Sequence, residues 1–351
     1  MTISNNKKIK IACLPVAGNE NPYQQLMIQG LNSHNELEAF NGVNDRFFGI
    51  IRTVLKYRPH FIHFDWIESY YTRRYDWLTY LDIPFFLVQV FFIKYILRVK
   101  IIWTLHNLYP HLKHQRKLHI RVQRSFAKYI NSIRLFSAQT LSAAMNTLQQ
   151  SEGKFKICSE GSYIGYYSNT VSQEEARKKL KIEVNRKVFL FFGTILPYKG
   201  LLELVKEFDL ANSLLICAGK VMDKEYFNTI KKESGNHIIF FDHFIPRDEV
   251  QYFFNAADIV VLPFTEIENS GSLILAMSFG KPVIAPATGL ILEKLNGQQH
   301  LLYQEGELKQ KLHEADAMSA LELHVPGENN FHQALKMDWS LFGNIFLHSI
   351  N

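Results

Sequence analysis

Short apolar runs, each followed by a longer segment of mixed polar and apolar positions, recur along this chain of 351 residues. Runs of Ile, Val, Leu and Phe of this length are typical of strands buried in a parallel sheet, and the segments between them have the spacing of helices. We therefore expect an α/β protein in which strands and helices alternate. The expected strands lie at 8–16, 60–66, 100–107, 133–137 and 154–158, and then at 187–192, 213–218, 237–241, 259–262 and 282–284.

A polar and highly charged stretch separates the two groups of strands. It runs from 166 to 186 and contains a Ser, Gln, Glu sequence that is typical of the start of a short helix. The length of the chain also favours two domains of ordinary size over one. The expected division is an N-terminal domain at 1–165, a linker at 166–186, a C-terminal domain at 187–325 and a closing helical segment at 326–351.

The stretch 263–286 carries the clearest chemical signal in the second half. Small residues stand where its short helix should begin, and the free amides and positive dipole end of a helix start suit an anion such as a diphosphate. Two acids precede them, and carboxylates accept hydrogen bonds from sugar hydroxyl groups. The alternative is an ordinary helix cap beside two solvated acids. The residues concerned are Glu266, Glu268, Ser270, Gly271 and Ser272.

Polar residues also follow three of the expected strands in the first half. The carboxyl ends of parallel strands meet at one edge of a sheet, and ligands bind at that edge in doubly wound folds. We therefore expect these residues to lie together, although no GxGxxG motif is present. The three groups are Gly18, Asn19, Glu20 and Asn21, then Asp65, then His106 and Asn107.

Composition narrows the class of protein. Hydrophobic residues make up 47% and charged residues 21%, which fits a globular protein and excludes a disordered one. The spacing of Cys13, Cys158 and Cys217 predicts neither a metal site nor a disulfide, so we expect reduced thiols in a cytoplasmic protein. We expect no signal peptide, and no apolar run of membrane-spanning length; the nearest candidate is 83–97.

The segment 83–151 contains no Asp or Glu. Together with the apolar run PFFLVQVFF, its basic residues favour a surface that contacts the anionic inner face of a cytoplasmic membrane. A solvated basic helix and a nucleic-acid surface are the alternatives, and the net charge of +6 fits all three. The basic residues are Lys94, Arg98, Lys100, Lys113, Arg116, Lys117, Arg121, Arg124, Lys128 and Arg134.

With both halves considered, the chain resembles glycosyltransferases of the GT-B fold, in which two Rossmann-like doubly wound domains face each other across a cleft. The segment 172–286 is similar to their linker and donor-binding core, and DWSLFGNIF at 338–346 is similar to the helix that crosses back onto the first domain. The motifs NPYQ, HFDW and WTLHN resemble bacterial family-four-like and β-mannosyltransferase-like enzymes of exopolysaccharide, capsule or O-antigen synthesis.

The resemblance implies transfer of a hexose from a nucleotide diphosphate sugar, either GDP-mannose or a UDP-hexose, to a hydroxyl of a lipid-linked saccharide. It implies no metal, no cofactor and no nucleic-acid partner. The first domain would bind the acceptor and the second the donor. The implied acceptor-side residues are Gly18, Asn19, Asn21 and Asn107, and the implied donor-side residues are Gly193, Thr194, Lys199, Glu266, Glu268, Ser270, Gly271 and Ser272.

The chain departs from the family pattern at two positions, and the first departure, together with the resemblance of SGSLILAMSFG to β-forming transferases, favours an inverting reaction; the second removes one phosphate cation. Retaining members have a second glutamate where Leu275 stands, and an arginine where Thr194 stands. An inverting transfer needs a general base for the acceptor hydroxyl, and the candidates are His106, Asp65 and Glu20. His106 could instead bind a phosphate or be structural, and Asp65 could cap a helix.

Other functions stay open at this point. The departures also fit a catalytically inactive GT-B homologue or a sugar-binding protein. A nucleotide-sugar epimerase or hydrolase would bind the same donor. Only the basic segment supports a nucleic-acid-binding function, and it contains no recognition motif.

Overall fold

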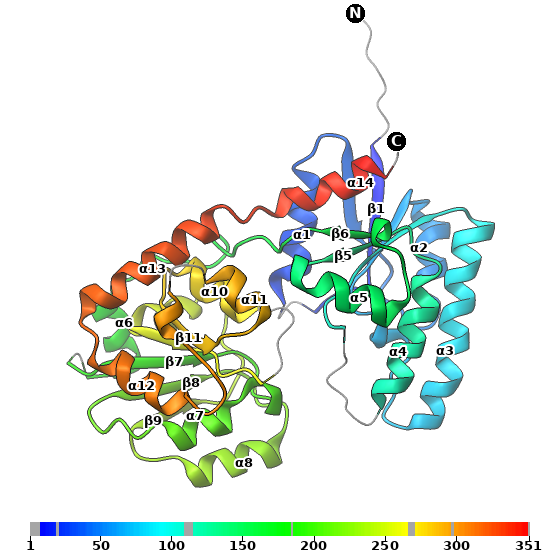
Figure 1. The fold of residues 1–351 in the computed structure, drawn as a ribbon. Coiled ribbons are helices and arrows are strands. Elements are labelled where there is room, and N and C mark those ends of the chain that lie inside the picture. The colour runs from blue at the N-terminus through cyan, green and yellow to red at the C-terminus, as the bar shows by residue number, and fades with distance from the viewer. Residues whose placement is uncertain are drawn as a thin grey trace, which may run out of the picture. The chain divides into compact units, whose positions relative to one another are not determined.

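The computed structural model describes residues 8–18, 21–108, 115–183, 185–265, 271–295 and 298–349. The chain divides into two compact units, drawn as a ribbon in Figure 1. Unit 1 comprises residues 1–161 and 338–351, and unit 2 comprises residues 162–337. The division differs from the expected one, because 166–186 and 326–337 both belong to unit 2.

Unit 1 contains a six-stranded sheet in which every pair of neighbouring strands is parallel. The strand order is β2-β1-β3-β4-β5-β6. The strands are β1 (Ile9–Leu14), β2 (Leu37–Asn41), β3 (Phe61–Phe64), β4 (Lys100–Thr104), β5 (Ser132–Leu135) and β6 (Phe155–Ile157). All of these except β2 match expected strands.

Helices cover both faces of this sheet, as Figure 1 shows. The α-helices are α1 (Pro22–Asn32), α2 (Gly49–Tyr57), α3 (Asp76–Phe91), α4 (Arg116–Ala127), α5 (Leu141–Leu148) and α14 (Gly343–His348). Short helical turns connect several of them, namely η1 (Ile67–Tyr70), η2 (Phe92–Ile96), η4 (Ala138–Thr140), η5 (Glu152–Lys154) and η8 (Trp339–Phe342). Asn21 caps α1, since its side-chain oxygen accepts a hydrogen bond from the amide of Tyr23 at 3.1 Å.

Unit 2 contains a second parallel sheet of six strands, in the order β12-β11-β10-β7-β8-β9. The strands are β7 (Val188–Phe192), β8 (Leu214–Ala218), β9 (Ile238–Phe241), β10 (Ile259–Val261), β11 (Val283–Pro286) and β12 (Leu302–Tyr303). The sequence predicted all of these except β12. Both missed strands, β2 and β12, are the outermost strand of their sheet.

The helices of unit 2 begin with the segment expected to be a linker. The α-helices are α6 (Gln173–Leu180), α7 (Leu201–Glu207), α8 (Lys224–Glu233), α9 (Val250–Ala256), α10 (Gly271–Ser278), α11 (Gly289–Lys294), α12 (Leu308–Ala317) and α13 (Ala320–Leu335), with turns η6 (Pro197–Lys199) and η7 (Gln299–Leu301). Arg177 of α6 donates to the carbonyl oxygen of Ala256 at 3.1 Å and forms an ion pair with Asp258 at 2.7 Å. These contacts anchor α6 to unit 2.

The C-terminal segment returns to unit 1 and completes one of its cores. Phe342 and Phe346 pack among buried residues of β1, β3 and α1. Gly30 and Gly161 leave room for Trp339, because a Cβ atom at either position would overlap its side chain. The last turns of the chain are therefore part of the packing of unit 1.

Helix α3 is longer than the apolar run in the sequence suggested. Together with η2 it spans 21 residues, Asp76–Ile96, and is long and apolar enough to cross a membrane by length and composition. The helix contains Asp76, Asp82 and Lys94, so it is longer than the uncharged apolar run expected from the sequence. Only 28% of its most apolar stretch is buried in the protein.

We predict that Phe346→Ala lowers the free energy of unfolding of unit 1 by about 3–5 kcal/mol, the usual cost of emptying a buried phenylalanine site. Phe346 is fully buried, and its ring lies edge-on to Phe61 and Phe342. The four tryptophans are Trp66, Trp77, Trp103 and Trp339. All of them belong to unit 1, so tryptophan fluorescence during urea denaturation measures the stability of this unit.

A nearby exposed residue supplies the control for this measurement. Leu341 is 47% exposed, so Leu341→Ala should change the stability by no more than about 0.5 kcal/mol. Equal effects of the two substitutions would show that the C-terminal segment does not contribute to the core of unit 1.

Candidate functional site

Each sheet has a point where the order of its strands reverses, and in such folds ligands bind there at the carboxyl ends of the strands. In unit 1 this point lies between β1 and β3, and in unit 2 it lies between β7 and β10. The loops that follow these four strands contain most of the residues singled out in the sequence. Each unit therefore has one candidate site.

The site in unit 1 is built around an Asp–His pair. Asp65 follows β3 and His106 follows β4, and His106 Nε2 lies 2.9 Å from Asp65 Oδ1. Gln24 of α1 donates to the other carboxylate oxygen at 3.2 Å and to the carbonyl oxygen of Pro15 at 2.8 Å. Asp65 is only 1% exposed, so its carboxylate interacts with His106 and Gln24 and not with solvent.

The electrostatics of the pair determine which nitrogen of His106 is basic. Burial raises the pKa of Asp65, but His63 and the hydrogen bonds from His106 and Gln24 outweigh it and hold the pKa below its ordinary value. Burial lowers the pKa of His63 to about 4, so His63 is neutral near pH 7. An ionised carboxylate can only accept hydrogen bonds, so His106 Nε2 carries a proton and Nδ1 is the basic nitrogen.

Aromatic rings fix the orientation of His106. The ring of Trp66 stacks on it with centroids 4.5 Å apart and an interplanar angle of 23°. Tyr23 lies edge-on at 5.0 Å, and Phe136 packs at 5.3 Å. The imidazole is therefore held both by its hydrogen bond and by its packing, as a positioned acid–base group requires.

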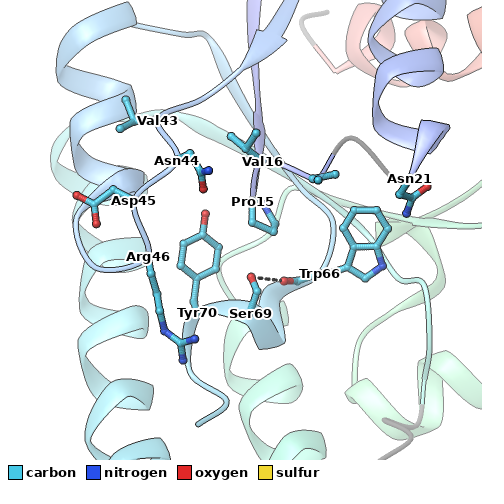
Figure 2. A pocket seen from close by; sticks show the side chains of 12 residues that line it. Pro15, Val16, Asn21, Val43, Asn44, Asp45, Arg46, Trp66, Ser69 and Tyr70 are labelled. Atoms are coloured by element: carbon cyan, nitrogen blue, oxygen red, sulfur yellow. Dashed lines mark hydrogen bonds between the residues drawn. The ribbon is translucent and has the colours of Figure 1, made fainter. Parts of the chain in front are cut away.

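A cavity of about 450 Å³ lies at the reversal point beside this pair, and Figure 2 shows its lining. Pro15, Gly18 and Asn21 border it from the loop after β1, and Trp66 from the loop after β3. Asn44, Asp45, Arg46 and Tyr70 line the side away from Trp66, whereas Ser69 lies beside Trp66. We call it the first cavity.

Arg46 brings a guanidinium group to the first cavity. It donates to the carbonyl oxygen of Thr72 at 2.6 Å and lies 3.6 Å from Asp82. Its buried Nε has no hydrogen-bond partner among the described residues. Burial lowers the pKa of this group, and the charge of Arg73 acts in the same direction.

A second cavity of about 280 Å³ shares Trp66 with the first cavity. It is bordered by η1 and α4, and we call it the η1–α4 cavity. His106, Asp65 and Asn107 line it, whereas Trp66 and Ser69 line both cavities. His106 thus contributes to the wall of the second cavity.

The site in unit 2 is built from the turn after β7 and the start of α10. Gly193 has φ of 137°, and a Cβ atom there would lie 2.9 Å from the hydroxyl oxygen of Ser272. The backbone of β7 therefore approaches the first turn of α10 closely, with Gly271 and Ser272 at its start and Thr194 exposed beside Gly193. Amides at the start of a helix are donors that suit an anion.

Lys199 supplies a cation to the same site. Its Nζ lies 4.3 Å from the ring centroid of Phe264 and 5.3 Å from that of Tyr198, and burial lowers its pKa to about 8. The turn that carries it is held against the end of β10, since the amide of Thr265 donates to the carbonyl oxygen of Tyr198 at 3.0 Å. No ion pair to Lys199 is formed by the described residues.

The structure brings together two sets of predicted residues. Asp65, His106 and Asn107 meet in unit 1, with Gly18 and Asn21 at the first cavity. Gly193, Thr194, Lys199, Gly271 and Ser272 gather at the reversal point of unit 2. The remaining candidates lie outside the described residues, and these are Asn19, Glu20, Glu266, Glu268 and Ser270.

Sequence reasoning missed several residues that line the cavities. Arg46 follows β2. Because β2 was not predicted, the sequence did not indicate that Arg46 lies in a loop at the end of a strand. Glu68 and Gln123 lie on helical segments, where a polar residue is ordinarily solvated. For Gln123, the available signal was its place between the apolar positions Val122 and Phe126 of α4.

Metal-ligating residues do not form a cluster in the described ranges. No group of three His, Cys, Asp or Glu side chains among these residues could hold a metal ion. Cys13, Cys158 and Cys217 are free thiols, and Cys13 and Cys217 are buried.

Residues 172–316 match the family model described as glycosyl transferases group 1. The chain is also 27% identical to an uncharacterized glycosyltransferase, MJ1607, from Methanocaldococcus jannaschii. This similarity covers 40% of the chain, and it spans only 38% of the length of that relative.

Solved structures match along almost the whole chain. Sucrose-phosphate synthase from Thermosynechococcus elongatus has a TM-score of 0.74 at 15% identity, covering 97% of this chain and 98% of that one. The chain has the GT-B fold. Two further GT-B structures are HepE from Anabaena in complex with UDP and glucose, with a TM-score of 0.74, 17% identity and coverage of 97% and 99%, and the lipopolysaccharide glycosyltransferase WaaG, with a TM-score of 0.63, 14% identity and coverage of 96% and 98%.

Proposed function

We propose that this protein is an inverting glycosyltransferase of surface polysaccharide synthesis. It transfers a hexose from GDP-mannose or a UDP-hexose to a hydroxyl of a lipid-linked saccharide. The observation that carries the proposal is the cation–amide site of unit 2, formed by Lys199 and the start of α10 within the glycosyl transferases group 1 segment. The complex of HepE with UDP and glucose supports this class of donor.

The donor site is suited to a leaving diphosphate. Lys199 has no carboxylate partner among the described residues, so a diphosphate would supply the missing counter-ion. Amides at the start of α10 add donors that are already oriented, and preorganised donors stabilise charge as it develops on a leaving group. We therefore propose that this cation and these amides hold the leaving group.

The acceptor site is suited to general base catalysis. The acceptor oxygen attacks the anomeric carbon, its proton passes to Nδ1 of His106, and the bond from that carbon to the diphosphate oxygen breaks. The diphosphate keeps the bonding electrons. Asp65 stabilises the imidazolium that forms, because its ionised carboxylate accepts a hydrogen bond from Nε2 at 2.9 Å.

We further propose that unit 1 contacts the anionic inner face of the cytoplasmic membrane. The outward face of α3 exposes large apolar side chains, among which Trp77 and Val88 are 63% and 64% exposed. Exposed basic residues lie on the neighbouring helix, and a cation near an anionic surface contributes about 1 kcal/mol. The basic residues that α4 and its end expose are Arg116, Lys117, Arg121 and Lys128.

Not every basic residue of the acid-free segment belongs to that surface. Arg134 is 1% exposed and donates to the carbonyl oxygens of Cys158 and Ser159. Lys100 donates to the carbonyl oxygen of Ser349 at 2.6 Å. Lys113 lies outside the described residues. The proposed surface is therefore smaller than the acid-free segment.

The first prediction concerns the donor. A thermal-shift screen of GDP- and UDP-sugars should identify a stabilising nucleotide, because a ligand that binds only the folded state raises its stability. Lys199→Ala should then weaken binding of that nucleoside diphosphate by about 1.5–3 kcal/mol, the range for a charge-assisted hydrogen bond. Lys206→Ala removes an exposed lysine of α7 and should leave the affinity unchanged.

This interaction should also depend on pH. The charged form of Lys199 predominates below its pKa of about 8, so affinity should fall as pH rises through that value. Lys199→Arg keeps its charge throughout and should remove this dependence. Equal affinity of the wild type and Lys199→Ala at pH 7 would rule out Lys199 as the phosphate contact.

The second prediction concerns the base. His106→Ala should lower kcat by about 10²–10⁴-fold with little change in the KM for the donor. Asp65→Asn should lower kcat by a smaller factor and change its pH profile, because Asp65 acts through His106.

The product formed by the wild type should have the opposite anomeric configuration to the donor when examined by NMR. Retention of configuration would exclude the inverting mechanism even if transfer occurs.

The third prediction concerns the membrane. Replacing the four exposed basic residues of α4 and its end by Gln should reduce co-sedimentation with anionic liposomes at least tenfold, since each contributes about 1 kcal/mol. Added salt should release the wild type, because screening shortens the range of the attraction. The control replaces four exposed lysines of unit 2 by Gln, namely Lys178, Lys179, Lys206 and Lys224.

The apolar contribution can be measured separately. Trp77→Ser combined with Val88→Ser should weaken binding to neutral and anionic vesicles alike, because these side chains would insert between headgroups. Equal binding by the wild type and by both sets of variants would show that these helices are ordinary solvated surfaces.

A further inference from the structure

One residue that lines the η1–α4 cavity has an unsatisfied hydrogen-bond acceptor. Gln123 of α4 is 6% exposed and lines this cavity. Its Nε2 donates to the carbonyl oxygen of Asn107 at 3.3 Å, which fixes the orientation of the amide. Its Oε1 is buried and accepts no hydrogen bond from the described residues. A buried acceptor without a donor is costly, so a ligand that donates here would be favoured.

A carboxylate lines the same cavity. Glu68 of η1 borders it, and burial raises the pKa of this group, with a further contribution from the charge of Asp65. A desolvated carboxyl group gains from hydrogen bonds donated to it. Glu68 and Gln123 would therefore both be stabilised by hydrogen-bond donors, and hydroxyl groups are such donors.

The remaining lining excludes an anion and indicates a compact ring. The residues that line the cavity include two His but no Lys or Arg, so no permanent positive charge there would balance a phosphate. Trp66, Tyr71 and Trp103 provide aromatic walls of the kind that suit the apolar face of a sugar. The volume of about 280 Å³ is far above the roughly 10–15 Å³ that a single water needs on this measure, which leaves room for one sugar ring.

We propose that the η1–α4 cavity is the subsite for the uncharged pyranose of the acceptor that carries the attacking hydroxyl. Glu68 and Gln123 select this sugar by accepting hydrogen bonds from its other hydroxyl groups. His106 lines the same cavity, so the attacking hydroxyl meets its basic nitrogen there. The first cavity shares Trp66 and Ser69 with this subsite and takes the next part of the acceptor. This assignment rests on the proposed function and adds the residues that determine acceptor selectivity.

The test measures sugar binding directly, without turnover. Saturation-transfer NMR on the full chain is recorded with the methyl glycosides of glucose, galactose, mannose and N-acetylglucosamine. The variants are Gln123→Leu, which removes the amide at similar size, and Glu68→Gln, which removes the charge. Glu152→Gln, at an exposed acid of unit 1 in η5, is the matched control. Thermal unfolding and nucleotide binding establish that each variant is folded.

We expect at least one glycoside to bind the wild type and the control, and to bind one or both cavity variants about fivefold to a hundredfold more weakly, the range for a lost buried hydrogen bond. Binding of no glycoside would overturn the proposal, and so would binding that both cavity variants leave unchanged. In either case nucleotide binding through Lys199 would remain intact. Loss of nucleotide binding in the wild type would instead refute the proposed function.

Discussion

All the chemistry of this protein depends on one geometric constraint, which is that the strands of each sheet are parallel. Their carboxyl ends lie at one edge, so loops that are distant in the sequence meet there. In unit 1 this brings Gln24, Asp65 and His106 into one hydrogen-bonded group, although Asp65 and His106 are 41 residues apart. In unit 2 it brings Gly193, after β7, against Ser272 of α10.

Buried charge is the cost of this arrangement, and the structure compensates for it with hydrogen bonds. Asp65 receives hydrogen bonds from two side chains, so it stays ionised although it is buried. Arg134 is equally buried, and it donates to two carbonyl oxygens and to the hydroxyl of Tyr23, while its guanidinium lies over the ring of Phe342. A buried charge that loses its partners is strongly destabilising, so these groups also tie β5, α1 and the C-terminal segment together.

The apolar surface of unit 1 begins at the rim of the first cavity. Asp45 and Arg46 line that cavity, and Phe47 and Phe48 follow them directly and are exposed. Phe48 lies edge-on to Phe85 of α3 at 5.4 Å, so the exposed aromatic surface continues from the loop onto that helix. An exposed apolar surface that extends over a loop and a helix marks a place of contact. If it is a membrane, a lipid-linked acceptor would reach the first cavity without leaving the surface.

The sequence by itself determined the alternation of strands and helices, ten of the twelve strands, and the loops that hold Asp65, His106, Gly193 and Lys199. These follow from local patterns, because a buried parallel strand needs a continuous apolar run and its end is marked by polar residues. Strands β2 and β12 lack that run, because β2 has the sequence LEAFN with exposed polar positions and β12 has only two residues. Missing β2 also hid Arg46. Tertiary structure alone decided that Asp65 supports His106, that Arg134 is buried and that Gln123 lines a cavity. Burial and hydrogen bonding at these positions depend on segments far away in the chain, and no local pattern of residues contains that information.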